Sequence, residues 1–259
     1  MKLKPLLLNK IKISLLFLVI LLLLTIIHIV NYKSYINNID NIRIVLSNID
    51  YNVLLLFNID LKNMDNPMNY YISFLNISII ILSLYSIILG IKTLNDNSYV
   101  DKYIQVNPLP KKIIYKKRAL ASLIHLVLVN VILFLTTYFI LLAFKIPHLF
   151  SILFYIFLAI LMIQVCFYTI SLVLFTFIKN KVATGVISIF ILSFFIILDL
   201  IYKNTSLSFL AYINPLSFFD FNKIVSSRVI GLDYLFSFLI ITFFSITFSY
   251  NEYIGDTYD

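Results

Sequence analysis

The chain alternates between long apolar runs and shorter polar stretches. Six runs are predominantly apolar and are 17 to 30 residues long, at 13–30, 70–91, 119–144, 149–178, 182–202 and 234–250. A helix of about 20 residues crosses the roughly 30 Å hydrocarbon layer of a bilayer. Continuous Leu, Ile and Phe also lack the apolar–polar alternation of a barrel strand. The pattern therefore predicts an all-α integral membrane protein with six transmembrane helices.

Composition supports a membrane location for the whole chain. It is 61% hydrophobic and only 12% charged, against about 25% charged residues in an ordinary soluble domain. We expect one membrane domain over 1–259, with outer segments at 31–69 and 203–233 and a cytoplasmic segment at 92–118. Trp is absent, so tyrosines at the ends of the runs are expected to form the interfacial belt. These are Tyr32, Tyr70, Tyr71, Tyr202, Tyr234 and Tyr250.

The distribution of Lys and Arg predicts the orientation. With the N-terminus inside, 13 of the 20 basic residues fall on cytoplasmic segments and 7 on the longer outer segments. Basic residues are retained on the cytoplasmic side, so both termini and 92–118 are expected there, in a multi-pass protein of the cytoplasmic membrane. The net charge of +8 suits anionic inner-leaflet lipid. A nucleic-acid partner is not expected, because these charges are split among several membrane flanks.

The sequence lacks the residues that most enzyme sites require. Its four glycines are too widely spaced for a phosphate-binding loop. His28, His125 and His148 lie on three separate segments, and Cys166 and Glu252 are the only residues of their types, so no metal-ligand spacing occurs. We therefore expect no catalytic residue, no cofactor and no metal in this chain.

Three polar side chains within the runs are candidates for a role inside the membrane. Asn130 and Gln164 can form hydrogen bonds between helices, which is the favoured interpretation, or line a substrate path. Asp199 is the one acid within a run, but it lies three residues before Tyr202. Two interpretations of Asp199 stay open: it is a functional acid within the membrane, or its side chain reaches the outer interface. Ion-coupled carriers usually carry several intramembrane charges, so a secondary carrier is less favoured.

The cytoplasmic segment contains a short amphipathic pattern. Val100, Tyr103 and Ile104 share one face at helical spacing, and Pro108 ends the pattern. We interpret this stretch as a docking element for a soluble partner; the alternative is a solvated loop whose lysines only set the topology. The candidate docking residues are Asp96, Tyr99, Val100, Tyr103, Ile104, Asn107 and Pro108.

The end of this segment resembles a motif of type-2 ATP-binding-cassette (ABC) exporter permeases. The motif is a Pro-apolar-Ser-Arg turn after a docked helix, with a Lys at the start of the third span. Pro108, Leu109 and Lys111 stand at the Pro, apolar and Arg positions, and Arg118 stands where the Lys falls. Pro110 replaces the Ser, and the family's Gly-Thr pair is missing. A helical outer segment between spans five and six is also typical of the family.

The resemblance implies a transport function without ATP hydrolysis in this chain. Two permease copies, identical or homologous, would form the pore, and each would rest on a separate ABC ATPase subunit that binds ATP and Mg²⁺. The abundance of Phe and Tyr favours an amphipathic or hydrophobic cargo, with a peptide as our choice. A non-transporting immunity or sensor-accessory membrane protein is the competing class, and a co-purifying ATPase would separate the two.

Overall fold

The computed structural model describes residues 3–50, 53–54, 59, 61, 64–94, 110–204, 209–217, 221–228 and 230–255. Over these residues it consists of helices without strands. Six are long and apolar enough to cross a membrane: α1 (Leu3–Val30), α5 (Pro67–Leu94), α7 (Lys111–Leu141), α8 (Leu149–Ile178), α9 (Lys181–Asn204) and α12 (Leu232–Gly255). The all-α, six-helix prediction is confirmed for the described part of the chain. Which side of the membrane each end faces stays a prediction.

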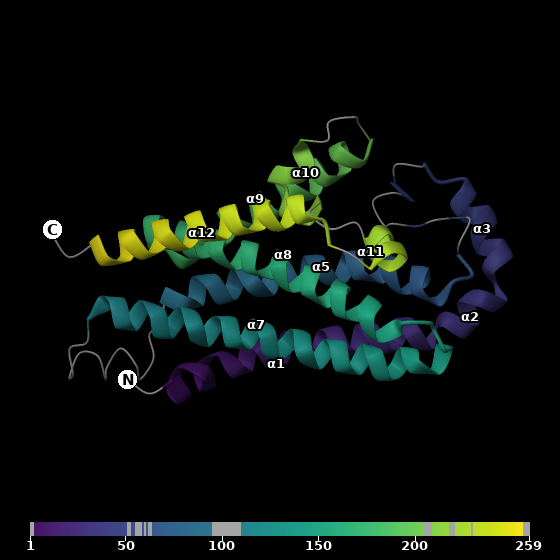
Figure 1. Cartoon of the computed structure of the whole chain (residues 1–259), viewed down its shortest axis with the longest axis horizontal. Coiled ribbons are helices and arrows are strands. Elements are labelled where there is room, and N and C mark those ends of the chain that lie inside the picture. The colour runs from purple at the N-terminus through teal and green to yellow at the C-terminus, as the bar shows by residue number, and fades with distance from the viewer. Residues whose placement is uncertain are drawn as a thin grey trace.

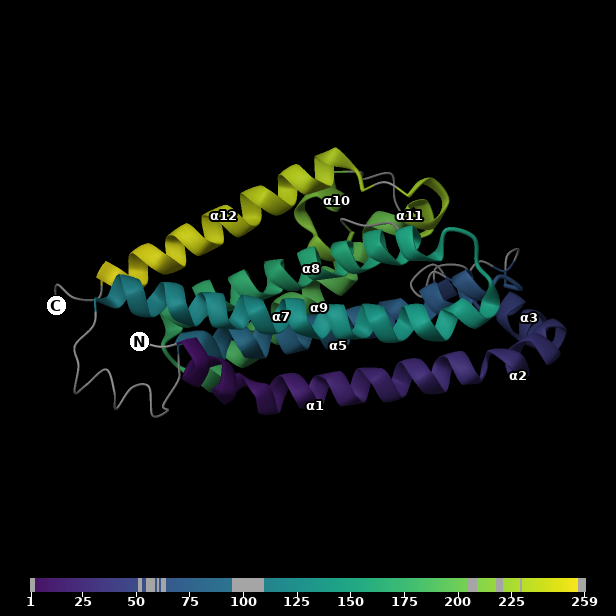
Figure 2. The same ribbon diagram turned by 60° about the horizontal axis from the view of Figure 1, so that its bottom comes forward.

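The six helices form an elongated bundle with α5 and α8 at its centre (Figure 1). These two pack most extensively on each other, and α5 also contacts α1, α7 and α9. In their most apolar windows, 67% of residues are buried in α5 and 61% in α8, against 22% in α1 and α9 and 11% in α12. Figure 2 shows α1 and α12 on opposite outer faces of the bundle. The apolar faces left exposed on these outer helices are those a bilayer would cover.

Gly90 allows the two central helices to approach closely. A Cβ at this position would lie 1.9 Å from the Ser171 hydroxyl oxygen and 2.6 Å from the Tyr168 carbonyl oxygen. No real side chain tolerates such distances, and the second neighbour is backbone that cannot turn aside. Glycine is therefore required where α5 crosses α8, for the close approach that small residues give membrane helices.

The two shortest predicted connections are tight turns in the structure. Helix α7 continues into η1 (Leu142–Phe144), and α8 begins at Leu149, which makes the antiparallel α7–α8 hairpin expected from the short Ile146–His148 link. Between α8 and α9, Lys179 takes a left-handed conformation with φ 56°. The Asn180 side chain then accepts hydrogen bonds from the amides of Val182 (2.9 Å) and Ala183 (3.2 Å). This N-cap explains how α9 restarts at once.

Two long helices begin earlier than the apolar runs predicted. Helix α1 starts at Leu3, ten residues before the apolar run, and passes through the lysine-rich flank without a break. Pro5 lies in its first turn, where proline is tolerated. Helix α7 starts at Lys111, eight residues before the apolar run. Hydrophobicity marks the membrane-embedded part of a helix, whereas Lys and Arg are good helix formers that extend it.

The bundle has two distinct ends, which we name by what they hold. The termini end holds the start of α1, the end of α5, the start of α7 and the end of α12 (Figure 1). The loop end holds α2 (Tyr32–Asn37), α3 (Ile39–Ser47), the α7–α8 turn and α11 (Phe221–Ser227). With α10 (Leu210–Ile213) and η2 (Pro215–Ser217), α11 gives the predicted helical segment between α9 and α12. This segment packs back on α5, α8, α9 and α12.

Tyr70 and Tyr71 illustrate how adjacent residues on one helix separate. The Tyr70 ring stacks on His28 of α1 with centroids 4.0 Å apart, and its hydroxyl donates to the His28 carbonyl at 3.0 Å. Tyr71 is 2% exposed, and its hydroxyl lies 3.4 Å from that of Thr137 inside the bundle. The prediction that Tyr71 joins the interfacial belt is therefore wrong, because its side chain points about 100° away from that of Tyr70 around the helix.

Candidate functional site

The residues predicted to dock a soluble partner lie outside the described part of the chain. Asp96, Tyr99, Val100, Tyr103, Ile104, Asn107 and Pro108 all fall within 95–109. The structure does describe the two helix ends that flank this stretch, Leu94 at the end of α5 and Lys111 at the start of α7. Both belong to the termini end of the bundle.

A buried lysine joins the helices at this end. Lys10 of α1 is 1% exposed, and its ammonium donates to the Ser122 hydroxyl of α7 and, at 3.4 Å, to the Thr93 hydroxyl of α5. The Thr93 and Ser122 hydroxyls lie 2.6 Å apart. The Tyr168 hydroxyl of α8 lies 3.4 Å from that of Thr93. Four long helices therefore meet at one polar cluster, one residue before the end of α5.

A second group of hydrogen bonds lies beside the first on the same helices. The Ser14 hydroxyl is 2.8 Å from the Tyr85 hydroxyl and 3.0 Å from Nδ1 of His125. His125 Nε2 lies 2.9 Å from the Leu7 carbonyl. A carbonyl only accepts, so Nε2 carries a hydrogen and bonds α7 to the first turns of α1. His125 is thus a packing residue with hydrogen-bond partners on both ring nitrogens.

Arg118 fixes the end of α5 from the neighbouring helix. It is 3% exposed, and its guanidinium donates to the Leu94 carbonyl at 3.0 Å. The last carbonyls of a helix have no partner within the helix, and a cation near them is favourable. One arginine of α7 therefore caps α5 at Leu94, the residue before the 95–109 stretch. We name Lys10, Thr93, Arg118, Ser122 and Tyr168 the root cluster.

The two cations of the root cluster are buried at a cost in free energy, so their position indicates a role in the bundle. Burying a cation in a membrane helix bundle costs several kcal/mol unless hydrogen bonds replace its hydration. Sequence reasoning used Lys10 for orientation and Arg118 for orientation and the motif resemblance, and it did not predict that both lie buried inside the bundle. A signal was present, since Arg118, Ser122 and His125 recur at i, i+4 and i+7 and so share one helix face. The matching Lys10 and Ser14 spacing on α1 was equally visible.

The two predicted amide residues come together in the middle of the bundle. The Asn130 amide of α7 donates to Gln164 Oε1 of α8, and to the Leu126 carbonyl at 2.9 Å. Both residues are buried. Asn130 Oδ1 and Gln164 Nε2 have no hydrogen-bond partner in the described structure. The pair thus bonds α7 to α8 and also leaves one acceptor and one donor inside the core, so the two roles considered from sequence both stay open.

Asp199 lies apart from these groups, towards the loop end. Its Oδ1 accepts a hydrogen bond from the Ser217 hydroxyl at 2.8 Å. Asn214 in turn donates to Ser217 at 2.9 Å and to the Phe195 carbonyl at 2.8 Å. All three side chains are buried. This arrangement fastens the α10–η2 segment to α9, which favours a structural role for the acid over a place on a substrate path.

The chemistry of the described residues is that of a helix bundle with polar ties. No cluster of three or more His, Cys, Asp or Glu side chains that could hold a metal occurs among them. No protein-family model, curated protein or solved structure matches the chain. The fold thus defines a class, a protein with six candidate membrane-spanning helices. Any narrower assignment must be argued from its sites.

Proposed function

We propose that this chain is the membrane-spanning permease subunit of an ATP-driven exporter of the type-2 ABC class. Residues 95–109 would dock on a separate cytoplasmic ATPase. Two permease copies would form the pore in the cytoplasmic membrane, and both termini would face the ATPase side. The cargo would be amphipathic or hydrophobic, with a peptide as the favoured class.

The observation that carries the proposal is the way both flanks of the 95–109 segment are fixed. Arg118 binds the last carbonyl of α5 at 3.0 Å, while Lys10 contacts Thr93 one residue earlier in α5 and Ser122 in α7, one turn beyond Arg118. A loop that only connects two helices needs no buried cations at its base. A segment that transmits force does need a rigid base, because a flexible one would absorb the movement.

The root cluster also suggests where such a movement would go. Through Lys10 it would reach α1, and through Tyr168 it would reach α8. Coupling between distant sites is carried by packed helices and hydrogen-bond networks that have two discrete arrangements. ATP-driven closure of the partner subunits would shift the base of 95–109, and α1 and α8 would follow as rigid bodies. Transport without an ATP site in this chain is consistent with the lack of a phosphate-binding loop.

The docking element provides the test. The tagged chain, purified in mild detergent from cells that hold its natural partners, should carry ATP hydrolysis that the isolated chain lacks. Tyr103→Ala with Ile104→Asp removes an aromatic and an aliphatic anchor, and loss of such anchors costs about 2 kcal/mol or more at an interface. Retained ATPase activity should then fall by more than about tenfold.

A matched control lies on the opposite face of the same predicted helix. Lys102 is about 200° around the helix from Ile104, at 100° per residue, so Lys102→Ala should leave ATPase retention unchanged. Equal ATPase retention in the double variant and the native chain would refute docking. It would favour the non-transporting alternative.

A further inference from the structure

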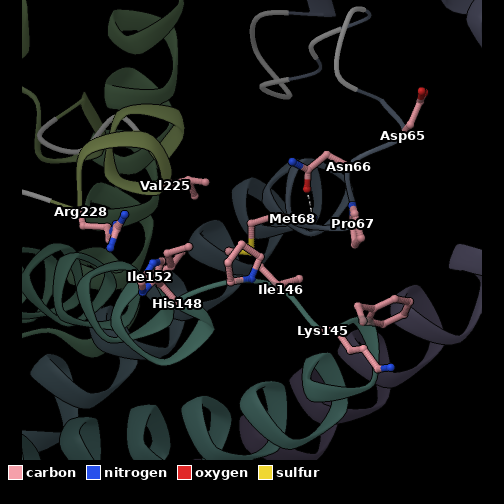
Figure 3. A pocket seen from close by; sticks show the side chains of 12 residues that line it. Asp65, Asn66, Pro67, Met68, Lys145, Ile146, His148, Ile152, Val225 and Arg228 are labelled. Carbon is pink, nitrogen blue, oxygen red and sulfur yellow. Dashed lines mark hydrogen bonds between the residues drawn. The ribbon is translucent and has the colours of Figure 1, made fainter.

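A cleft of about 640 Å³ opens at the loop end, far from the root cluster. It lies between the start of α5, the turn between α7 and α8, and the end of α11 (Figure 3). These elements adjoin the ends of candidate spans, at the level where a bilayer passes from hydrocarbon to headgroups. The cleft is therefore accessible to a ligand that is partly polar and partly apolar.

The residues with acidic or basic side chains that line the cleft are mainly basic. Arg228, His148 and Lys145 line it, and all three are exposed. Asp65 is the acidic residue of the lining, and its carboxylate already accepts a hydrogen bond from Arg43 at 2.9 Å. The guanidinium of Arg43 thus pairs with this carboxylate, and it also lies 3.5 Å from that of Asp40. What remains at the cleft is an excess of positive charge with donors directed at no described acid.

The side chains in Figure 3 identify which donors could act together. Arg228 and His148 lie at the same side of the cleft, whereas the Lys145 ammonium points away from them. The lining beside them is apolar and includes the half-buried Ile146 and Val225 over the buried Met68 and Ile152. A guanidinium and an imidazole next to an apolar surface match a phosphate group attached to a hydrocarbon chain, because arginine forms paired hydrogen bonds to phosphate oxygens.

The backbone around the cleft is held in a costly conformation. Lys145, His148 and Arg228 have φ of 52°, 55° and 57°, and Lys179 is the one other non-glycine residue with positive φ in the described chain. Such a conformation is unfavourable for residues other than glycine. Residues of this kind gather where a ligand must meet a preformed site. Three of the four lie on one cleft.

We propose that this cleft binds the headgroup of an anionic phospholipid, with Arg228 and His148 on the phosphate and the acyl chain against the apolar side. A guanidinium and an imidazole at the edge of a bilayer can donate hydrogen bonds to the phosphate of such a lipid. The assignment does not depend on the ATPase proposal, since it uses the opposite end of the bundle.

Native mass spectrometry of the detergent-purified protein with equimolar phosphatidylglycerol and phosphatidylcholine tests the proposal. The native chain should retain mainly phosphatidylglycerol. Arg228→Gln with His148→Gln should retain about tenfold less, because a hydrogen bond to a charged group is worth about 1.5–3 kcal/mol. Glutamine keeps the backbone cost of the left-handed conformation similar, so folding should be preserved, as a thermal melt would show.

The control is Lys33→Gln, which removes one exposed basic charge of α2 at the same end and should leave lipid retention unchanged. Three results would overturn the proposal. They are equal retention of the two lipids by the native chain, equal phosphatidylglycerol on the native and double-variant chains, and displacement of the lipid by millimolar inorganic phosphate. The last would assign the cleft to a free anion instead.

Discussion

The two ends of this bundle use basic residues in opposite ways. At the termini end, Lys10 and Arg118 are buried, and each has a hydroxyl or carbonyl partner on another helix. At the loop end, Lys145, His148 and Arg228 are exposed around an open cleft. The buried cations join helices to each other, whereas the exposed ones are available to something outside the chain.

This difference bears on what a basic residue near a membrane signifies. Counting Lys and Arg on each side predicts orientation, and by that measure Lys10 and Lys145 differ only in side. Their surroundings differ far more, because a buried ammonium must exchange water for protein acceptors. Charge position therefore predicts topology, while burial separates the residues that bond helices to each other from those available to a ligand.

The largest expected effect concerns which end faces the cytoplasm. In a Cys166→Ser background, Lys112→Cys would place an exposed thiol at the termini end and Lys33→Cys one at the loop end. A membrane-impermeant maleimide added to intact cells should label the second and leave the first unlabelled until the cells are opened. Because the two sites lie at opposite ends of the bundle, only one of the two thiols should be labelled in intact cells. Labelling of residue 112 in intact cells would reverse the orientation and remove the docking proposal.

The next effect concerns the packing beneath the root cluster. Gly90→Ala should lower the free energy of unfolding by about 3 kcal/mol, the upper range for overpacking a core, since its Cβ would meet the Tyr168 carbonyl at 2.6 Å. The control is Gly185→Ala in α9, where the nearest atom is Ile91 Cδ1 at 3.9 Å. That change should be neutral or stabilising by up to about 1 kcal/mol from helix propensity. Thermal melts in detergent would compare the two, and equal melting temperatures would contradict the α5–α8 crossing.

How far the sequence predicts this structure depends on the kind of signal. The apolar runs located all six long helices. Such a run gives a strong signal because about 20 apolar side chains together favour a membrane or a protein interior over water. Helix α8 matches its predicted bounds of 149–178. The starts of α1 and α7 were missed because helix continuity beyond the membrane depends on local propensity, which hydropathy does not report.

The candidate sites were harder to predict because they depend on contacts between helices. Nothing local to Lys10 says that Thr93 and Ser122 lie within its reach, since those residues are 83 and 112 positions away. Asn130 and Gln164 could be named because a polar residue stands out in an apolar run. The loop-end cleft depends on three segments distant in sequence, and no spacing along the chain predicts it.

The smallest expected effect on stability, and the sharpest on function, comes from Lys10→Met. Methionine retains the unbranched stem and removes the charge, and replacing a buried charge by an apolar group of similar volume is often neutral or stabilising. Thr93 and Ser122 keep each other as partners at 2.6 Å. The free energy of unfolding should therefore stay within about 1 kcal/mol of the native value or rise. If the root cluster transmits movement to α1, ATP-dependent export should nevertheless fall.

Lys33→Met makes the same change at an exposed position of the loop end and should alter neither quantity. A loss of stability above about 3 kcal/mol, the cost of breaking a buried pair, would identify Lys10 as a structural anchor. Full export by a stable Lys10→Met chain would remove it from the transmission route. The two ends would then differ in the role of their basic residues: the buried Lys10 would transmit movement between helices, and the exposed residues of the loop end would bind a ligand. A charge whose removal costs activity without costing stability is retained for function.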